Sequence, residues 1–294
     1  MTKIRHIFPI FFGMMCITAC QQGQQDVLFV CQEYADSALL VPTAPAESPV
    51  CKSSIRLFLL QAKEESGLTP SIERINRYII DEMLPDCRDI PEEKASETFV
   101  KAQIKEFAGH VRSLYYEQLE AYDEMEEMVG MDETSEWEEY DEELLKDSFT
   151  ERYSYEYNIT TEAHIGYADS IVCYTMKSYI YTGGAHPTTI SRICSFSLTN
   201  GQVVRPSDIF RDGTHDELVD RLTKRLMEMN DAHSLDELQD MGYLDIADMF
   251  ITNNMLLERN HIVFHYDTYE LAPYAFGEID ISFTYAELED LMNL

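Results

Sequence analysis

The sequence predicts an α+β fold of two halves, with antiparallel β-sheet and helices packed on one side. Apolar and polar residues alternate over residues 155–165, the period of a half-buried strand. Apolar residues recur at helical spacing in two stretches before residue 126. Consecutive apolar runs after residue 150 are separated by glycine turns such as Asn200-Gly201, which favours antiparallel hairpins.

Charge restricts the class of partner. The 294 residues include 22 basic and 54 acidic ones, a formal net charge of −32. This field repels nucleic acid and anionic membrane surfaces and attracts cationic partners. The length fits one or two domains.

The N-terminus resembles a lipoprotein signal peptide, residues 1–19. Lys3 and Arg5 precede an apolar run, residues 7–17, that is too short to span a bilayer. The run ends in Ile-Thr-Ala-Cys, a match to the bacterial lipobox, which implies lipid attachment to Cys20. The alternative is a plain secretory signal with a coincidental cysteine.

A lipid on Cys20 implies a membrane anchor in the bacterial cell envelope, with residues 20–25 as a polar tether. Whether the chain faces the periplasm or the cell exterior stays open. Five further cysteines remain, an odd number whose spacing fits no zinc motif: Cys31, Cys51, Cys87, Cys173 and Cys194. We therefore expect no metal and no cofactor, and Cys31 with Cys51 is the pair we select if any disulfide forms.

The first half, residues 26–148, is predicted to contain two strands and then two helices. The strands cover residues 27–34 and 51–60, and the helices run from Thr69-Pro70 to Pro85 and onward from Pro91. About half of residues 117–147 are acidic, and Gly130 is expected to break the helix there. Such a block is either a solvated helix end with a linker or a docking surface for a cationic protein with Trp137, Tyr140 and Leu144 as anchors. Calcium binding lacks the required ligand loop.

The second half, residues 149–294, centres on a hairpin. Its strands are residues 171–181 and 189–199, and the apolar positions predict that Tyr174 pairs with Phe196. The candidate ligand-binding residues lie at its tip and in one later turn: Tyr181, Thr182, Gly183, Gly184, His186, Thr188 and Tyr274.

Further elements follow the hairpin. Capping boxes at Thr214 and Ser234 predict two helices. Residues 261–266 and 278–285 are expected strands, and residues 286–292 an expected short helix.

Three segments of this half form a recognisable set. They are Tyr181-x-Gly-Gly-Ala-His186, then Asn200-Gly201 with residues 207–210, and finally residues 269–277 running into Tyr285 and Glu287-Leu288. In their order and spacing they resemble the RsiV-like C-terminal domain. Pro187 stands where that family usually has glycine.

The resemblance implies a surface role. Characterised relatives occur as the extracytoplasmic part of anti-sigma factors that bind lysozyme, or beside peptidoglycan deacetylases. This chain lacks a sigma-binding segment and a deacetylase motif, so neither activity carries over. What the resemblance implies for this chain is a binding role towards lysozyme-type proteins or cell-wall glycan.

Catalysis has weaker support. His186 is either a ligand contact or catalytic base, or a structural residue that packs against residues 272–274, and we favour packing. Ser195, His186 and Asp208 contain the residue types of a hydrolytic triad, but Ser195 lies mid-strand without a nucleophile turn. His261 and His265 are too far apart along a strand to chelate one metal.

We therefore expect a non-enzymatic, lipid-anchored binding protein that captures a cationic protein such as lysozyme. The alternative is a glycan binder that uses its many tyrosines, and an enzyme with an unrecognised site is the third choice.

Overall fold

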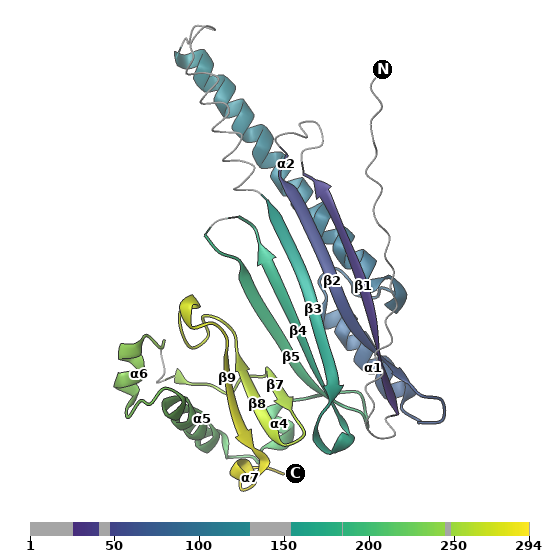
Figure 1. The fold of residues 1–294 in the computed structure, drawn as a ribbon, viewed down its shortest axis with the longest axis vertical. Coiled ribbons are helices and arrows are strands. Elements are labelled where there is room, and N and C mark those ends of the chain that lie inside the picture. The colour runs from purple at the N-terminus through teal and green to yellow at the C-terminus, as the bar shows by residue number, and fades with distance from the viewer. Residues whose placement is uncertain (1–25, 41–47, 130–153, 184, 245–247, 294) are drawn as a thin grey trace.

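A computed structural model describes residues 26–40, 48–129, 154–183, 185–244 and 248–293 of the chain. The expected signal peptide, Cys20 and tether lie outside these residues, as do residues 130–147 of the acidic segment. The described residues form the expected α+β fold, in which the strands make two sheets (Figure 1). None of the described helices is long and apolar enough to cross a bilayer.

The larger sheet has six strands in the order β1 to β6. They are β1 (Val27–Leu39), β2 (Val50–Ala62), β3 (Tyr155–Ile165), β4 (Ile171–Tyr181), β5 (Thr188–Ser197) and β6 (Val203–Val204). Every neighbouring pair is antiparallel except β2 and β3, which are parallel. The parallel pair departs from the expected antiparallel pattern because the intervening chain crosses over through the helices. The sheet thus takes strands from both sides of residue 149.

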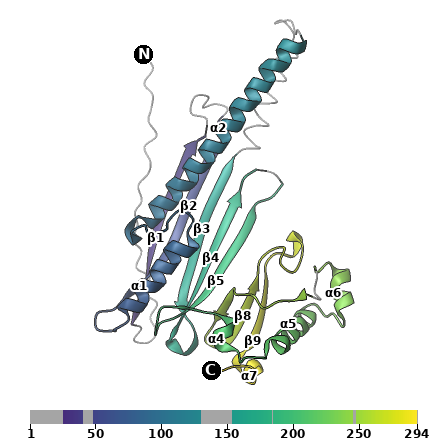
Figure 2. The same cartoon turned by 180° about the vertical axis from the view of Figure 1, so that it is seen from behind.

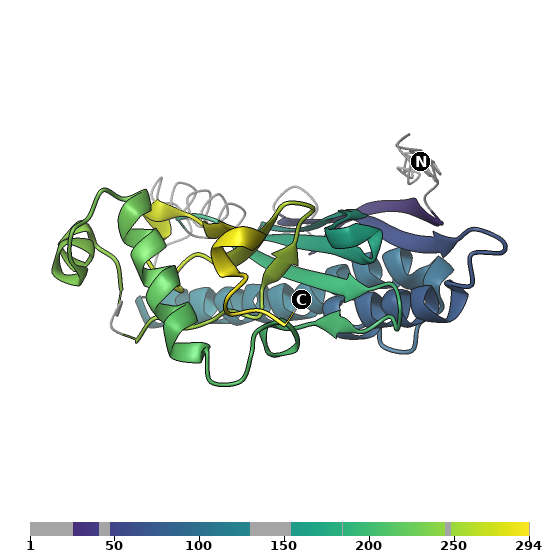
Figure 3. The ribbon, with the colours of Figure 1, turned by 90° about the horizontal axis from the view of Figure 1, so that it is seen from below.

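Helices cover one face of this sheet (Figure 2). They are α1 (Thr69–Tyr78), which continues as a π-helical turn (Ile79–Met83), and α2 (Ala95–Val129), preceded by a 3-10 turn (Glu92–Lys94). Pro70 stands in the first turn of α1, as predicted. Figure 3 shows both helices, in blue, along the same side of the sheet. Ile75, Ile79 and Phe99 are fully buried in the core between the layers.

One side chain of α1 completes the edge of β2. The ladder between β2 and β3 ends at Arg56 and Thr160, so β2 continues beyond its partner. Asn76, which is buried, takes the place of a strand there: its amide accepts from Leu60 N and donates to Leu60 O, both at 2.9 Å. These two bonds satisfy backbone groups that would otherwise be buried without partners.

The second sheet packs on the opposite face of β4 and β5. It consists of β7 (Met255–Leu257), β8 (His261–Tyr266) and β9 (Ile279–Thr284), surrounded by α4 (Pro206–Ile209), α5 (His215–Met229), α6 (Leu235–Met241) and α7 (Tyr285–Leu288). Ser195 Oγ accepts from Leu257 N at 2.8 Å and donates to Met255 O at 3.2 Å, which ties β5 to β7. Alternate residues of β4 accordingly lie in two different cores. Val172 packs in the core between the sheet and the helices, and Cys173 packs in the core between the two sheets.

The approach of β7 to β4 requires glycine at one position. A Cβ on Gly166 would lie 2.2 Å from the backbone oxygen of Leu257 and 2.6 Å from Cys173 Sγ. Both distances are shorter than any real Cβ contact. A side chain at this position would therefore push the two sheets apart.

The predicted hairpin is present, but its register differs by two residues. Tyr174 lies opposite Cys194, and Phe196 lies opposite Val172. Alternation specifies which residues share a face, and a shift of two residues leaves that unchanged, so the pattern could not distinguish these registers. The predicted faces are correct: Tyr174 and Phe196 are both fully buried in the core beneath α1 and α2.

Two smaller expectations were wrong. Thr214 precedes α5 without capping it through its side chain, since its hydroxyl donates to Arg211 O instead. Cys31 lies opposite Phe58, whereas Cys51 lies seven residues from Phe58 along β2, a separation of about 23 Å. A disulfide between these two cysteines is therefore impossible in this fold. Ser234 does cap α6, accepting from Glu237 N.

A carboxylate in the first turn of α7, that of Glu287, makes the stability of the folded protein depend on pH. Glu287 accepts from the hydroxyl and the backbone N–H of Thr284 and pairs with Arg225 of α5, and these bonds lower its pKa from 4.5 to about 2. A depressed folded-state pKa contributes stability that is present above pH 4.5 and lost as pH falls towards 2. We predict that Glu287→Gln destabilises the protein by about 1 kcal/mol at pH 7, a figure kept small by solvent screening.

Urea unfolding at several pH values checks this prediction. The difference between Glu287→Gln and the parent protein should shrink as the pH falls from 4.5 to 2. Glu289→Gln, at an exposed neighbouring carboxylate, is the control and should show no such trend. A difference that stays constant across this range would contradict the assignment.

Candidate functional site

The predicted binding residues lie where two loops meet. The first, called the tip, is residues 182–187 between β4 and β5. The second, called the facing loop, is residues 267–278 between β8 and β9. The His186 ring stacks on the Tyr274 ring, with centroids 4.0 Å apart and an interplanar angle of 17°. The expected packing of His186 against residues 272–274 is thus confirmed.

The other predicted residues occupy the same end of the hairpin. Tyr181 ends β4 and is half-buried, opposite Glu156 of β3. Thr182 and Thr188 are exposed. Gly183 has φ of +84°, a left-handed conformation that glycine adopts without strain. Gly184 lies outside the described residues.

Aromatic side chains extend from this contact across the facing loop. Tyr269 lies 6.1 Å from Tyr274 between ring centroids, and the two residues are 55% and 38% exposed. Phe276, 41% exposed, contacts Tyr243 edge-on at 5.2 Å. We call His186, Tyr269, Tyr274 and Phe276 the aromatic surface. Exposed rings held by neighbouring rings suit contact with a ligand, because little side-chain freedom remains to be lost.

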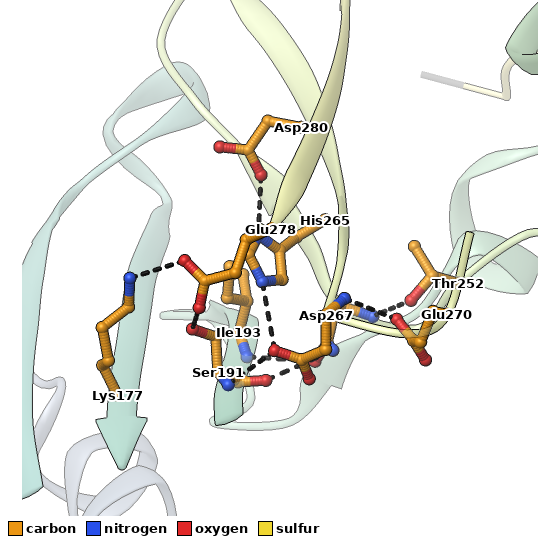
Figure 4. Close-up of polar contacts among 10 residues, drawn as sticks. Lys177, Ser191, Ile193, Thr252, His265, Asp267, Glu270, Glu278 and Asp280 are labelled. Carbon is orange, nitrogen blue, oxygen red and sulfur yellow. Dashed lines mark hydrogen bonds and ion pairs between the residues drawn. The ribbon is translucent and has the colours of Figure 1, made fainter. Parts of the chain in front are cut away.

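Below the tip, polar side chains connect the hairpin to the facing loop (Figure 4). Lys177 and Ser191 lie opposite each other on β4 and β5. The Lys177 ammonium donates to Glu278 Oε2 at 2.6 Å, and the Ser191 hydroxyl donates to Glu278 Oε1 at 2.7 Å. Ser191 N donates to Asp267 Oδ1 at 2.7 Å. Both ends of the facing loop are thereby fixed to the hairpin.

His265 of β8 lies at the centre of these contacts. Its side chain is 5% exposed, with Nδ1 2.6 Å from Asp280 Oδ1 and Nε2 3.5 Å from Asp267 Oδ1. Burial opposes the charged ring, but the neighbouring carboxylates of Asp267 and Asp280 outweigh it and raise the pKa of His265 to about 9. Nε2 makes no hydrogen bond despite its ion-pair distance to Asp267. We call the buried His265 together with the half-buried Asp267 and Glu278 the buried cluster.

Two groups of described side chains have metal-ligand spacing: the buried cluster, and His164 with Cys173 and Glu258. In the second group burial raises the pKa of Cys173 to about 12, so its thiol stays protonated and donates to Leu257 O. His164 Nε2 lies 2.8 Å from Glu258 Oε2, a hydrogen bond that raises the pKa of His164 and lowers that of Glu258. In the second group His164 and Glu258 are therefore bonded to each other, and Cys173 is bonded to the backbone of β7.

The residue types of a hydrolytic triad do not come together. Ser195 is fully buried and bonds to β7, seven residues along β5 from Thr188 beside the tip, about 23 Å away. Asp208 accepts from Arg205 N at the start of α4, whereas His186 is exposed at the tip. His261 and His265 lie at opposite ends of the β8 ladder, facing Thr284 and Asp280.

Sequence reasoning missed the buried cluster. Its only local sign is that His265 and Asp267 are two residues apart, the spacing that puts side chains on one face of a strand. The path of the facing loop brings Glu278 close to His265 and Asp267. Packing between the two sheets brings Ser191 into contact with Asp267 and Glu278. Both placements depend on tertiary structure.

Part of the chain matches a family model whose function is unknown. Residues 207–286 match the family model described as Protein of unknown function (DUF3298). This match runs from α4 to β9 and so includes the whole facing loop, but not the tip.

Two solved structures share the fold. A DUF3298 family member from Bacteroides fragilis is 22% identical, with a TM-score of 0.72, over 93% of this chain and 96% of its own. A DUF3298 family protein from Pseudomonas aeruginosa is 15% identical, with a TM-score of 0.50, over 90% of this chain and 94% of its own. No curated protein matches the chain significantly.

Proposed function

We propose that the chain is a lipid-anchored, extracytoplasmic binding protein that captures a cationic protein, with lysozyme-type proteins as the leading candidate. The observation that carries this proposal is the aromatic surface, which combines exposed rings from two loops that polar contacts hold together. Ligand capture requires such an exposed and pre-organised surface. The anchor is Cys20, and the cell envelope is the proposed location.

Charge supports a cationic ligand. A net charge of −32 attracts a basic protein over long range and accelerates its association. The aromatic surface would then supply short-range contacts, the kind that aromatic residues commonly provide at protein interfaces. The resemblance to RsiV-like domains points to the same class of ligand.

A cell-wall glycan is the second candidate, and the exposed rings of Tyr269 and Tyr274 favour it. Sugars pack on aromatic faces, and neutral sugars gain nothing from the charge of the protein. The two candidates therefore differ in their dependence on salt.

Calorimetric titration of the purified protein with lysozyme, at low and at physiological salt, tests the proposal. We predict saturable 1:1 binding that persists at physiological salt, because the ring contacts are not screened. Tyr274→Ala removes the ring that stacks on His186 and should weaken binding on the order of 10-fold, the effect of losing a central interface residue.

Tyr167→Ala is the matched control. Tyr167 also contacts the ring of a tyrosine, Tyr285, with centroids 4.4 Å apart, but lies before β4, at the opposite end of that strand from the tip. This variant should bind as the parent protein does. Binding that disappears at physiological salt, or that weakens equally in both variants, would contradict the proposal. Salt-independent binding of peptidoglycan fragments would support the glycan candidate.

A further inference from the structure

We propose that His265, Asp267 and Glu278 bind one divalent transition-metal ion of the Zn²⁺ type. One nitrogen and two oxygen ligands come from the three side chains, whose ligand atoms all lie within 4.8 Å of one another. This proposal concerns the base of the facing loop and stands whether or not the proposed function holds.

The first argument is an unsatisfied nitrogen. His265 Nε2 is buried, makes no hydrogen bond, and points towards the carboxylate of Asp267 (Figure 4). A buried polar atom without a partner is costly, so an atom of this kind calls for a ligand. A cation between Nε2 and the two carboxylates would satisfy it.

The second argument is the orientation of the ring. Asp280 can only accept a hydrogen bond, so Nδ1 carries the proton at the 2.6 Å contact between them. Metal-binding histidines in proteins typically donate their other ring N–H to a carboxylate in this way. Asp280 thus fixes the ring with Nε2 as the nitrogen that becomes the ligand once its proton leaves.

The ligand types and charges also match. One imidazole with two carboxylates suits Zn²⁺ and neighbouring divalent ions. A doubly charged ion would neutralise Asp267 and Glu278, and the Nε2 proton would leave to solvent as the metal binds. Glu278 could keep its contact with Lys177 through one oxygen and use the other as the ligand.

The bound metal would clamp the facing loop at both ends. Asp267 is the first residue after β8, and Glu278 is the last residue before β9. Coordination of both to His265 would fix the ends of the segment that carries Tyr269, Tyr274 and Phe276. Metal binding would thus stabilise the aromatic surface.

Calorimetry on EDTA-stripped, purified protein, with Zn²⁺ as the titrant, tests the inference. The parent protein should bind one Zn²⁺ at a site that Asp267→Asn and Glu278→Gln each weaken by more than about 100-fold. Asp280→Asn should weaken it by about 10–100-fold, the usual effect of changing a partner of a metal-bound histidine. Scanning calorimetry should show a higher unfolding temperature with Zn²⁺ in the parent protein and in His164→Ala, but not in Asp267→Asn or Glu278→Gln.

Two features of the design keep the test decisive. Asn at position 267 can still accept from Ser191 N, and Gln at 278 can still accept from the Ser191 hydroxyl, so both variants keep the contacts with Ser191. Glu278→Gln loses the ion pair with Lys177, whereas Asp267→Asn leaves that pair in place. His164→Ala disrupts the other group of potential ligands and should leave the site intact. Absence of saturable binding, binding unchanged in Asp267→Asn and Glu278→Gln, or loss only in His164→Ala would each overturn the inference.

Discussion

Gly166→Ala is expected to destabilise the protein by about 3 kcal/mol and to disturb the aromatic surface. The added methyl group would overlap the backbone oxygen of Leu257 in β7, which cannot move without moving the second sheet. Overpacking of this kind typically costs about 1–3 kcal/mol, and a backbone atom gives way less readily than a side chain. Because the second sheet carries the facing loop, its displacement should also separate Tyr274 from His186.

Urea unfolding and NMR chemical shifts of the His186 ring measure these two effects. Gly109→Ala is the control, because Gly109 lies in α2 with nothing within 4 Å of an added Cβ. Alanine there should stabilise the protein by about 0.5–1 kcal/mol through helix propensity. If Gly166→Ala were as stable as the parent protein, the close approach of β7 to β4 would be incorrect.

Asn76→Ala is expected to cost about 3 kcal/mol. The substitution removes the amide that satisfies both backbone groups of Leu60, and each buried group left without a partner costs about 1–3 kcal/mol. Asn76 also donates to Glu92 at 3.1 Å, so α1 would lose a contact with the turn that leads into α2.

Equilibrium unfolding in urea again provides the measurement. Asn253→Ala, at an exposed asparagine, is the control and should change stability by less than about 0.5 kcal/mol. Equal effects in the two variants would show that Asn76 does not complete the edge of β2.

The fold could be predicted from the sequence wherever local patterns determine it. Alternation predicted β3, and proline at the start of a helix predicted α1, because these signals act within a few residues. The parallel pairing of β2 with β3 could not be predicted, since no local pattern records which strand lies beside β2. The three residues of β7 are too few to show a period.

The candidate site likewise has one part that the sequence predicts and one part that it does not. The tip could be located because glycine and proline mark a turn, and the packing of His186 against residues 272–274 was the favoured alternative for that residue. The buried cluster could not be foreseen from spacing, because Glu278 and His265 are joined by a loop whose path depends on Ser191 and Lys177 of another sheet. Ser195, although polar, is fully buried because it supplies both bonds that join β5 to β7.

The parallel pair of strands also affects the order in which the chain can fold during its synthesis. Ser54 bonds to Asn158, a partner made 104 residues later. Until β3 emerges, Ile55 and its apolar neighbours on β2 lack part of the core that finally covers them. Closing so long a loop is slow, because its entropy must be lost before the contacts form. Strand β2 is therefore synthesised well before the partner that completes its surroundings.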